Sequence, residues 1–240
     1  MDLESRIMSI YSGHSATNKL YFPLMETIMD IRDSVRSEVL DYQQLVACLN
    51  GYAKPRDRIG AFLADGSLVR VRKGLYVFGE RYRRTLVSRE VLANLIYGPS
   101  YISLDYALSI HGLIPERVTE VTCMTAGEKR RFTTPFGVFS YRPLSLRRYA
   151  PGIDWAGEGE ARYLLASPEK ALVDKVWSDP RFRPTRQSDF DSYLLADLRL
   201  DENRLAALDF GRIDNIASAY ASGKVTLLAR YLAKRYRRET

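Results

Sequence analysis

Cysteine and histidine are scarce in this sequence, with two of each in 240 residues. Cys48 and Cys123 lie in unrelated apolar contexts without the spacing of a metal site, which favours a reducing compartment over a disulfide framework. His14 and His111 are not part of an HExxH motif, and there is no paired CxxC motif. We therefore expect no metal site.

Long apolar runs are also missing. No stretch approaches the roughly eighteen apolar residues that a membrane-spanning helix needs. The start, "MDLESRIMSIYSGHS", is polar and acidic and lacks the apolar core of a secretory signal. We expect a cytoplasmic protein without a membrane partner.

The common catalytic motifs are absent as well. The chain has neither a glycine-rich phosphate loop nor a GxSxG elbow. Glu169 and Asp174, interspersed with Lys170 and Lys175, could belong to a metal-dependent nuclease, but no further acid at a recognisable spacing completes the set. A salt-bridged helix face is the favoured interpretation, so we expect no catalytic residue and no cofactor. An enzyme that acts on nucleic acid is kept as an alternative function.

Positive charge, by contrast, is abundant and unevenly placed. The net charge is +7 and the isoelectric point is near 9.4. Residues 51–89 hold ten Lys or Arg and three acids, so this segment alone carries the net charge of the whole chain. A second basic cluster, "LAKRYRR", lies near the C-terminus. Such a distribution indicates an acidic partner such as nucleic acid.

The order of elements around this basic segment is informative. Apolar spacing predicts helices over 22–35, where Leu24, Ile28 and Ile31 recur, and after the N-cap Asp41. A third helix begins near Pro55 and ends before Gly66, and the ribbon "LVRVRKGLYVFG" follows it. Helices followed by a two-stranded ribbon are typical of a winged helix-turn-helix.

The third helix, "PRDRIGAFLA", has two different faces. Ile59, Phe62 and Leu63 form the expected core face, whereas Gly60, Ala61 and Ala64 lie opposite, between Arg56 and Arg58. Small side chains let a helix lie close to the floor of a DNA groove, and flanking arginines can reach phosphates or a guanine edge. Asp57 suits the helix dipole, with a cytosine contact as the alternative.

The ribbon alternates valine with arginine. We expect Val69 and Val71 to pack on the helices while Arg70 and Arg72 face outward, with Lys73 exposed at the turn that Gly74 permits. The alternative is a solvated edge strand guarded by its cations. The predicted DNA contacts in this segment are Lys54, Arg56, Arg58, Arg70, Arg72 and Lys73.

The rest of the chain predicts a larger mixed domain. Two helices separated at Gly98-Pro99 precede strands over 117–125 and 136–144, a strong helix starts at the N-cap Ser167, and three helices close the chain. The loop between the strands holds Lys129, Arg130 and Arg131, which with Arg147 and Arg148 form a candidate second DNA contact; a solvated loop is the alternative.

Together these patterns predict an α+β protein. Its expected parts are a polar arm over 1–20, a winged helix-turn-helix over 21–84 and a larger α+β domain over 85–240.

Several segments occur in an order that resembles the AbiEi family of type IV antitoxin regulators. They are "LVRVRKGLYVF", "YGPSYISLDYALSIHGLIPE", "VTCMT", "FGVFSYRPL" and "ASPEKALVDKVW", and the resemblance runs from about residue 25 to about residue 235. The sequence departs from the family in its longer polar arm before residue 22 and in the insertion "DPRFRPTRQ".

The resemblance implies a DNA-binding antitoxin. Family members bind inverted repeats in their own promoter through an N-terminal winged helix, and their C-terminal domain contributes to DNA binding and counteracts a co-encoded nucleotidyltransferase-like toxin, usually without a stable complex. Arg56, Arg58, Arg70, Arg72 and Lys73 match the helix and wing positions that contact DNA. The alternative is a winged-helix transcription factor whose C-terminal domain senses a small molecule.

Overall fold

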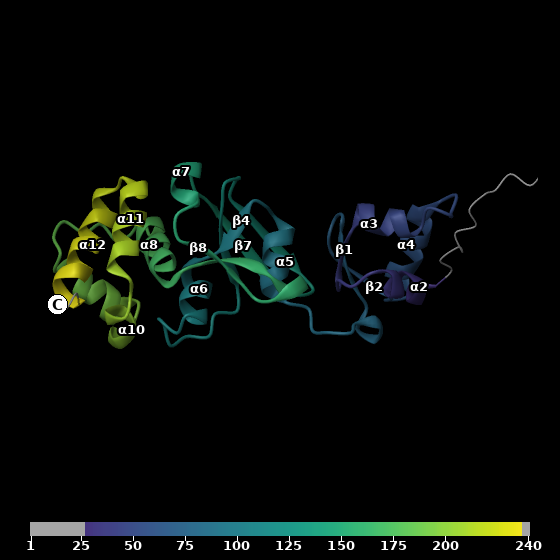
Figure 1. The fold of residues 1–240 in the computed structure, drawn as a ribbon, viewed down its shortest axis with the longest axis horizontal. Coiled ribbons are helices and arrows are strands. Elements are labelled where there is room, and N and C mark those ends of the chain that lie inside the picture. The colour runs from purple at the N-terminus through teal and green to yellow at the C-terminus, as the bar shows by residue number, and fades with distance from the viewer. Residues whose placement is uncertain (1–26, 237–240) are drawn as a thin grey trace, which may run out of the picture.

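The computed structural model describes residues 27–236 of an α+β protein. The predicted arm over 1–20, Leu24 and the last two arginines of "LAKRYRR" lie outside the described residues. Figure 1 shows three groups of elements along the long axis: small helices with a short sheet, then a larger sheet, then a group of helices that contains the end of α12.

The first group, here called the N-terminal module (residues 27–82), matches the predicted order of helices and ribbon. Its elements are α2 (Ile28–Ser34), β1 (Val39–Asp41), α3 (Tyr42–Cys48), α4 (Pro55–Ala64), β2 (Leu68–Arg72) and β3 (Leu75–Phe78), followed by a short 3-10 turn (Glu80–Tyr82). The three strands form an antiparallel sheet in the order β1-β3-β2. Strand β1 was not among the predicted elements.

Local signals in the sequence explain where the helices begin. The Asp41 carboxylate accepts from the Gln44 backbone N–H at 2.8 Å, and the Gln44 side chain accepts from the Asp41 N–H at 2.9 Å. Asp41 is thus the N-cap of α3, as predicted, and the reciprocal cap starts the helix directly after β1. Pro55 occupies the first turn of α4, where its missing N–H costs no helical hydrogen bond.

The small sheet buries apolar side chains on both of its faces. Leu68, Tyr76 and Phe78 share a core with the helices, including Ile59 and Phe62 of α4. The helices therefore cover one face of the sheet.

The other face of this sheet belongs to a second core. Val71, Leu75 and Val77 are buried in the large hydrophobic cluster that the C-terminal elements build. The prediction that the valines pack on the preceding helices is therefore wrong for Val71. Burying one such side chain contributes roughly 1.5–3 kcal/mol, so this contact holds the module to the rest of the chain.

The connection after the module is also tied down. One oxygen of Glu38 accepts from the backbone N–H groups of Arg84 and Thr85 at 3.0 and 3.1 Å, and it pairs with the buried Arg32 guanidinium at 3.0 Å. Because three donors converge on one carboxylate, residues 84–85 are fixed to the start of β1.

The larger sheet has six strands in the order β6-β7-β5-β4-β9-β8. Its strands are β4 (Ser100–Ile102), β5 (Val121–Thr125), β6 (Arg130–Thr134), β7 (Gly137–Pro143), β8 (Ile153–Ala156) and β9 (Tyr163–Ala166). The β4–β9 and β5–β7 pairs are parallel and the others antiparallel. The predicted strands appear as β5 and β7, whereas the predicted basic loop contains the edge strand β6.

Helices complete the C-terminal part. They are α5 (Arg89–Ile96), α6 (Leu104–Ile110), α7 (Leu146–Tyr149), α8 (Pro168–Ser178), α9 (Asp189–Asp191) with a π-helical continuation (Ser192–Asp197), α10 (Glu202–Ala206), α11 (Phe210–Tyr220) and α12 (Gly223–Tyr236), with a 3-10 turn at Gly159–Ala161. Ser167 caps α8 by accepting from the Lys170 N–H, as predicted. Helix α11 ends at Tyr220, and α12 begins at Gly223.

Within residues 27–236, no helix combines the length and apolar character required to cross a membrane.

Candidate nucleic-acid interface

A groove lies between α4 and the β2–β3 hairpin, with a volume of about 790 Å³. It is called the α4–hairpin groove below. Its lining residues are Tyr42, Arg56, Ile59, Gly60, Arg70, Lys73, Gly74 and Tyr76. Three of them are cations and none is an acid, so the groove attracts anionic ligands.

Arg56 is the best-oriented cation of the groove. Its side chain is exposed, and its Nε donates to the Tyr42 hydroxyl at 2.9 Å. This hydrogen bond raises the pKa of the Arg56 guanidinium. Elsewhere in residues 27–236 Arg56 has no hydrogen-bond or ion-pair partner, so its two terminal nitrogens are available to a ligand.

Arg58 behaves differently although it flanks the same helix. It is half-buried, and its guanidinium carbon lies 4.8 Å from the centroid of the Phe62 ring and 5.8 Å from that of Tyr52. It does not line the α4–hairpin groove. The two arginines that the sequence places on equivalent rims are therefore not equivalent.

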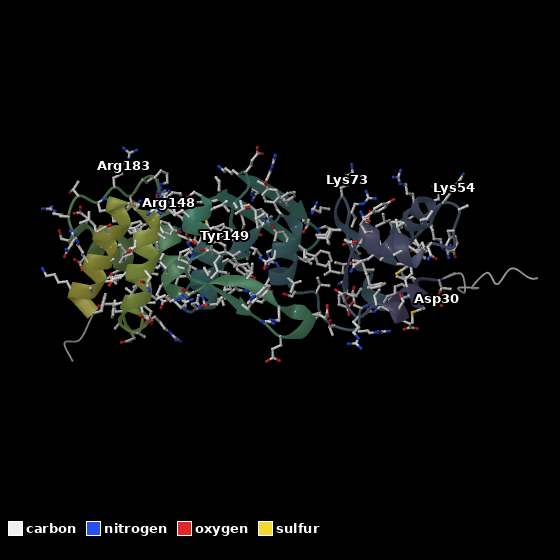
Figure 2. The ribbon with its side chains drawn as sticks, turned by 45° about the horizontal axis from the view of Figure 1, so that its top comes forward. Asp30, Lys54, Lys73, Arg148, Tyr149 and Arg183 are labelled. Carbon is white, nitrogen blue, oxygen red and sulfur yellow. The ribbon has the colours of Figure 1, made fainter. Side chains whose placement is uncertain are left out.

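The hairpin supplies the other cations. Arg70 is exposed above the Tyr76 ring at 5.9 Å, on the same sheet face as Leu68 and therefore toward α4. Lys73 is exposed at the turn, where Gly74 has a φ of 83° that favours glycine. In Figure 2, Lys54 and Lys73 project from the same side of the N-terminal module.

Arg72 does not accompany Arg70. The pairing of β2 with β3 is irregular between these two residues, and the Arg72 guanidinium donates to the Leu95 carbonyl of α5 at 3.4 Å and to the Lys73 carbonyl at 3.3 Å. Both arginines are exposed, as predicted, but Arg72 leans toward the C-terminal part instead of the groove.

The second predicted basic group lies at the edge of the large sheet. Lys129, Arg130 and Arg131 are exposed, and they line a groove of about 880 Å³ together with Arg142 and Trp177. Their charge is partly neutralised, because Arg130 pairs with Glu128 at 2.5 Å and Arg131 pairs with Glu120 at 3.1 Å. This groove is less cationic than its sequence indicates.

The neighbours Arg147 and Arg148 have different environments. Arg147 is exposed on α7, whereas Arg148 is half-buried with its Nε donating to the Tyr220 carbonyl at 2.9 Å. The Arg148 guanidinium also lies 5.0 Å from the centroid of the Trp177 ring. These contacts fasten α7 to α8 and α11, which leaves Arg147 as the accessible member of the pair.

A buried polar cluster centred on Asp174 was missed by the sequence analysis. The Asp174 carboxylate accepts from the hydroxyls of Tyr101 at 2.9 Å and Ser103 at 2.6 Å, and also from the Tyr220 hydroxyl. Lys170 donates to the Tyr220 hydroxyl at 2.8 Å and lies 3.6 Å from Asp174. This set is called the Asp174 cluster below.

The predicted ion pairs on α8 are therefore real, but the principal one is internal. The side chains of Lys170 and Asp174 are 0% exposed, and burial lowers the pKa of the Lys170 ammonium and raises the pKa of the Asp174 carboxyl. Only Lys175 reaches toward the surface, where it pairs with Asp105 at 2.6 Å. The sequence signal that Lys170 and Asp174 are buried is the apolar run around them. Because Ala171, Leu172, Val173 and Val176 are apolar, α8 has no wide polar face.

The Asp174 cluster connects α8 to β4, to the start of α6 and to α11. Asp174 accepts three hydrogen bonds and Lys170 donates two, to the Tyr220 hydroxyl and the Arg148 carbonyl, and neither side chain is exposed. This geometry suits the fastening of helices better than contact with a substrate.

No protein-family model matches the chain, and no match is found among curated proteins.

Proposed function

We propose that this chain is a DNA-binding regulator of the antitoxin type. In this proposal α3, α4 and the β2–β3 hairpin form a winged helix-turn-helix, and the winged helix reads duplex DNA in the promoter of its own operon. The observation that carries the proposal is the α4–hairpin groove, which is lined by exposed Arg56, Arg70 and Lys73 together with Gly60 of α4.

The chemistry of the groove suits duplex DNA. Gly60, Ala61 and Ala64 are exposed, so that the α4 backbone is accessible to a broad surface such as a groove floor. The cations at the borders would contact phosphates and release counterions, which supplies affinity without sequence preference. The exposed Lys54 at the start of α4 and Lys73 at the hairpin turn extend this charged border.

The antitoxin half of the proposal rests on the ordered resemblance to the AbiEi family. The winged helix would repress the operon, and residues 85–240 would counteract a co-encoded nucleotidyltransferase-like toxin. The second basic groove, with Lys129, Arg130 and Arg131, would contribute a further DNA contact through the charge that its ion pairs leave.

One observation favours the alternative of a ligand-sensing transcription factor. A cavity of about 410 Å³ lies where the N-terminal module meets the C-terminal part, and its lining includes Arg32, Glu38, Arg84 and Glu160. Within residues 27–236, Glu38 Oε2 and Arg32 Nε are buried without a hydrogen-bond partner. A small polar ligand could supply those partners and act on the connection between the two parts.

Two measurements test the proposal and separate it from the alternative. The full-length chain should shift duplex DNA from its own promoter, and Arg56→Ala with Arg70→Ala should abolish the shift. The same chain, expressed from an unrelated promoter, should restore growth to cells that produce the toxin. Promoter binding without rescue would favour the ligand-sensing regulator, and failure to bind any duplex would contradict both.

A further inference from the structure

Within residues 27–236, neither a contact nor a backbone angle requires Gly60 to be glycine. It lies inside the ten-residue helix α4, where glycine is less stable than alanine. A Cβ atom built at this position would meet nothing within 4 Å, and Gly60 is not among the residues with positive φ. An alanine would fit the isolated protein and would strengthen the helix.

Other glycines of the same module do have internal reasons. Gly74 has a φ of 83°, which side chains rarely adopt, and a Cβ at Gly79 would collide with the backbone of Gly66. Gly60 differs from both because its open side faces the α4–hairpin groove. Within residues 27–236, no contact requires glycine here, and the open side of α4 leaves room for the surface of a ligand.

Arg56 lies one helical turn before Gly60 and on the same face of α4, because residues four apart on a helix are neighbours. Its Nε is held by the Tyr42 hydroxyl at 2.9 Å, which leaves the two terminal nitrogens as a fork. Such a fork matches the O6 and N7 acceptors of guanine in the major groove.

The other arginines of the module are less suited to reading a base. Arg58 packs over Phe62, and Arg72 donates to Leu95 of α5. Arg70 is on the hairpin, where contacts with phosphates predominate in the proposed docking.

We propose that Gly60 marks the point where α4 approaches duplex DNA most closely, and that Arg56, positioned by Tyr42, reads a guanine beside it. This inference rests on the proposed DNA-binding function and deepens it by naming the base and the residues that select it. Tyr42 is a positioning residue, since it acts on the base through Arg56.

The test begins with selection of the preferred sequence from a randomised duplex oligonucleotide pool by the full-length chain. Affinity for the selected duplex and thermal unfolding are then measured on the parent and on Gly60→Ala. We expect Tm to rise and binding to weaken roughly tenfold, the effect of one methyl group in a closely packed contact. Gly60→Leu should weaken binding further.

Gly223→Ala is the matched control for Gly60→Ala. Like Gly60, Gly223 has open space around its Cβ position and no positive φ. It differs in its location, because it starts α12 in the helical group at the other end of the molecule. This variant should raise or maintain Tm and bind the selected duplex as the parent does. Parental affinity in Gly60→Ala would overturn the close approach.

The positioning role of Tyr42 is tested with Tyr42→Phe, which removes only the hydroxyl. We expect the preference for guanine at one position to fall roughly five- to tenfold, while the slope of log affinity against log salt stays constant. Arg56→Ala should lose the same preference. If Tyr42→Phe keeps the full preference while Arg56→Ala loses it, the positioning role is wrong and Arg56 reads the base unaided.

These outcomes are distinct from failure of the proposed function. If the parent binds the duplex pool and Arg56→Ala binds it more weakly, but neither Gly60→Ala nor Tyr42→Phe has an effect, DNA binding stands and this inference fails. If the parent binds no duplex at all, the proposed function fails and the inference falls with it.

Discussion

The α4–hairpin groove and the Asp174 cluster each join a tyrosine hydroxyl to a cationic side chain, Arg56 in the groove and Lys170 in the cluster. They differ in their acids and in their exposure. No acid lines the groove, where Arg56 is exposed with one partner, whereas Asp174 accepts from three hydroxyls and its ion pair with Lys170 is fully buried. Exposed cations with unused donors can bind an anionic ligand, whereas the buried and paired acid and amine join elements of the fold.

Neighbouring residues show the same contrast at short range. Arg147 is exposed while Arg148 donates to the Tyr220 carbonyl, and Arg70 lines the groove while Arg72 donates to Leu95. A basic run in a sequence thus contains both exposed cations and cations that hold the fold together. The two can be told apart only when the hydrogen-bond partners of each residue are known.

The largest expected effect comes from breaking the Asp174 cluster. Lys170→Met should lower the free energy of unfolding by about 3–5 kcal/mol, because it leaves a buried carboxylate without its cation. The double variant Lys170→Met, Asp174→Asn should recover part of this loss, since the amide oxygen can still accept from the hydroxyls. Urea unfolding measures both values, and a single variant as stable as the parent would contradict the fastening role.

The opposite pattern is expected in the groove. Arg56→Ala should weaken binding of promoter DNA by roughly 1–3 kcal/mol, while its free energy of unfolding stays within about 0.5 kcal/mol of the parent because the side chain is exposed. Electrophoretic mobility shift and urea unfolding on the same preparation give the two numbers. Equal losses of stability and affinity would show that Arg56 is structural.

The arginine pair on α7 sharpens the comparison within two adjacent positions. Arg148→Ala should lower the free energy of unfolding by about 1–3 kcal/mol, because it removes a hydrogen bond from a charged group and a contact with the Trp177 ring. Arg147→Ala serves as its control and should leave stability unchanged. The two unfolding midpoints, compared directly, would contradict this assignment if they coincide.

A smaller effect is expected from the hairpin and the second basic groove, and it concerns salt dependence. Lys73→Ala should reduce the slope of log affinity against log salt by about 0.9, the value for one phosphate contact on duplex DNA. Lys129→Ala should do the same if β6 contacts DNA, whereas Arg131→Ala should change it less because Arg131 already pairs with Glu120. Affinities over a series of salt concentrations give the slopes.

The sequence is most predictive where a signal is local. Asp41 and Ser167 identify the starts of α3 and α8, because each caps its helix through a residue three positions later. Pro55 identifies the start of α4, because proline suits the first turn of a helix. The hairpin turn at Gly74 is equally local.

Prediction is poorest for elements whose partners are distant in the sequence. Strands β1 and β4 have three residues each and exist through pairing with β3, and with β5 and β9. The same limit applies to the candidate site: alternation places Arg70 and Arg72 together, but the irregular pairing between them separates their directions. The three hydroxyls that donate to Asp174 lie 46 to 73 residues away, so spacing along the sequence could identify only Lys170, four residues earlier, as a partner.

The small β1-β3-β2 sheet is covered by helices on one face and by the larger core on the other, so it joins the N-terminal module to the C-terminal part. Glu38 adds a second connection, because it binds the backbone of residues 84–85. On a duplex bound in the α4–hairpin groove, the C-terminal helical group would therefore have one defined orientation relative to the DNA. If two copies bound two half-sites of one operator, the spacing of the half-sites would set the distance and angle between the C-terminal helical groups of the two copies. The length of the operator would therefore determine whether these groups can contact each other.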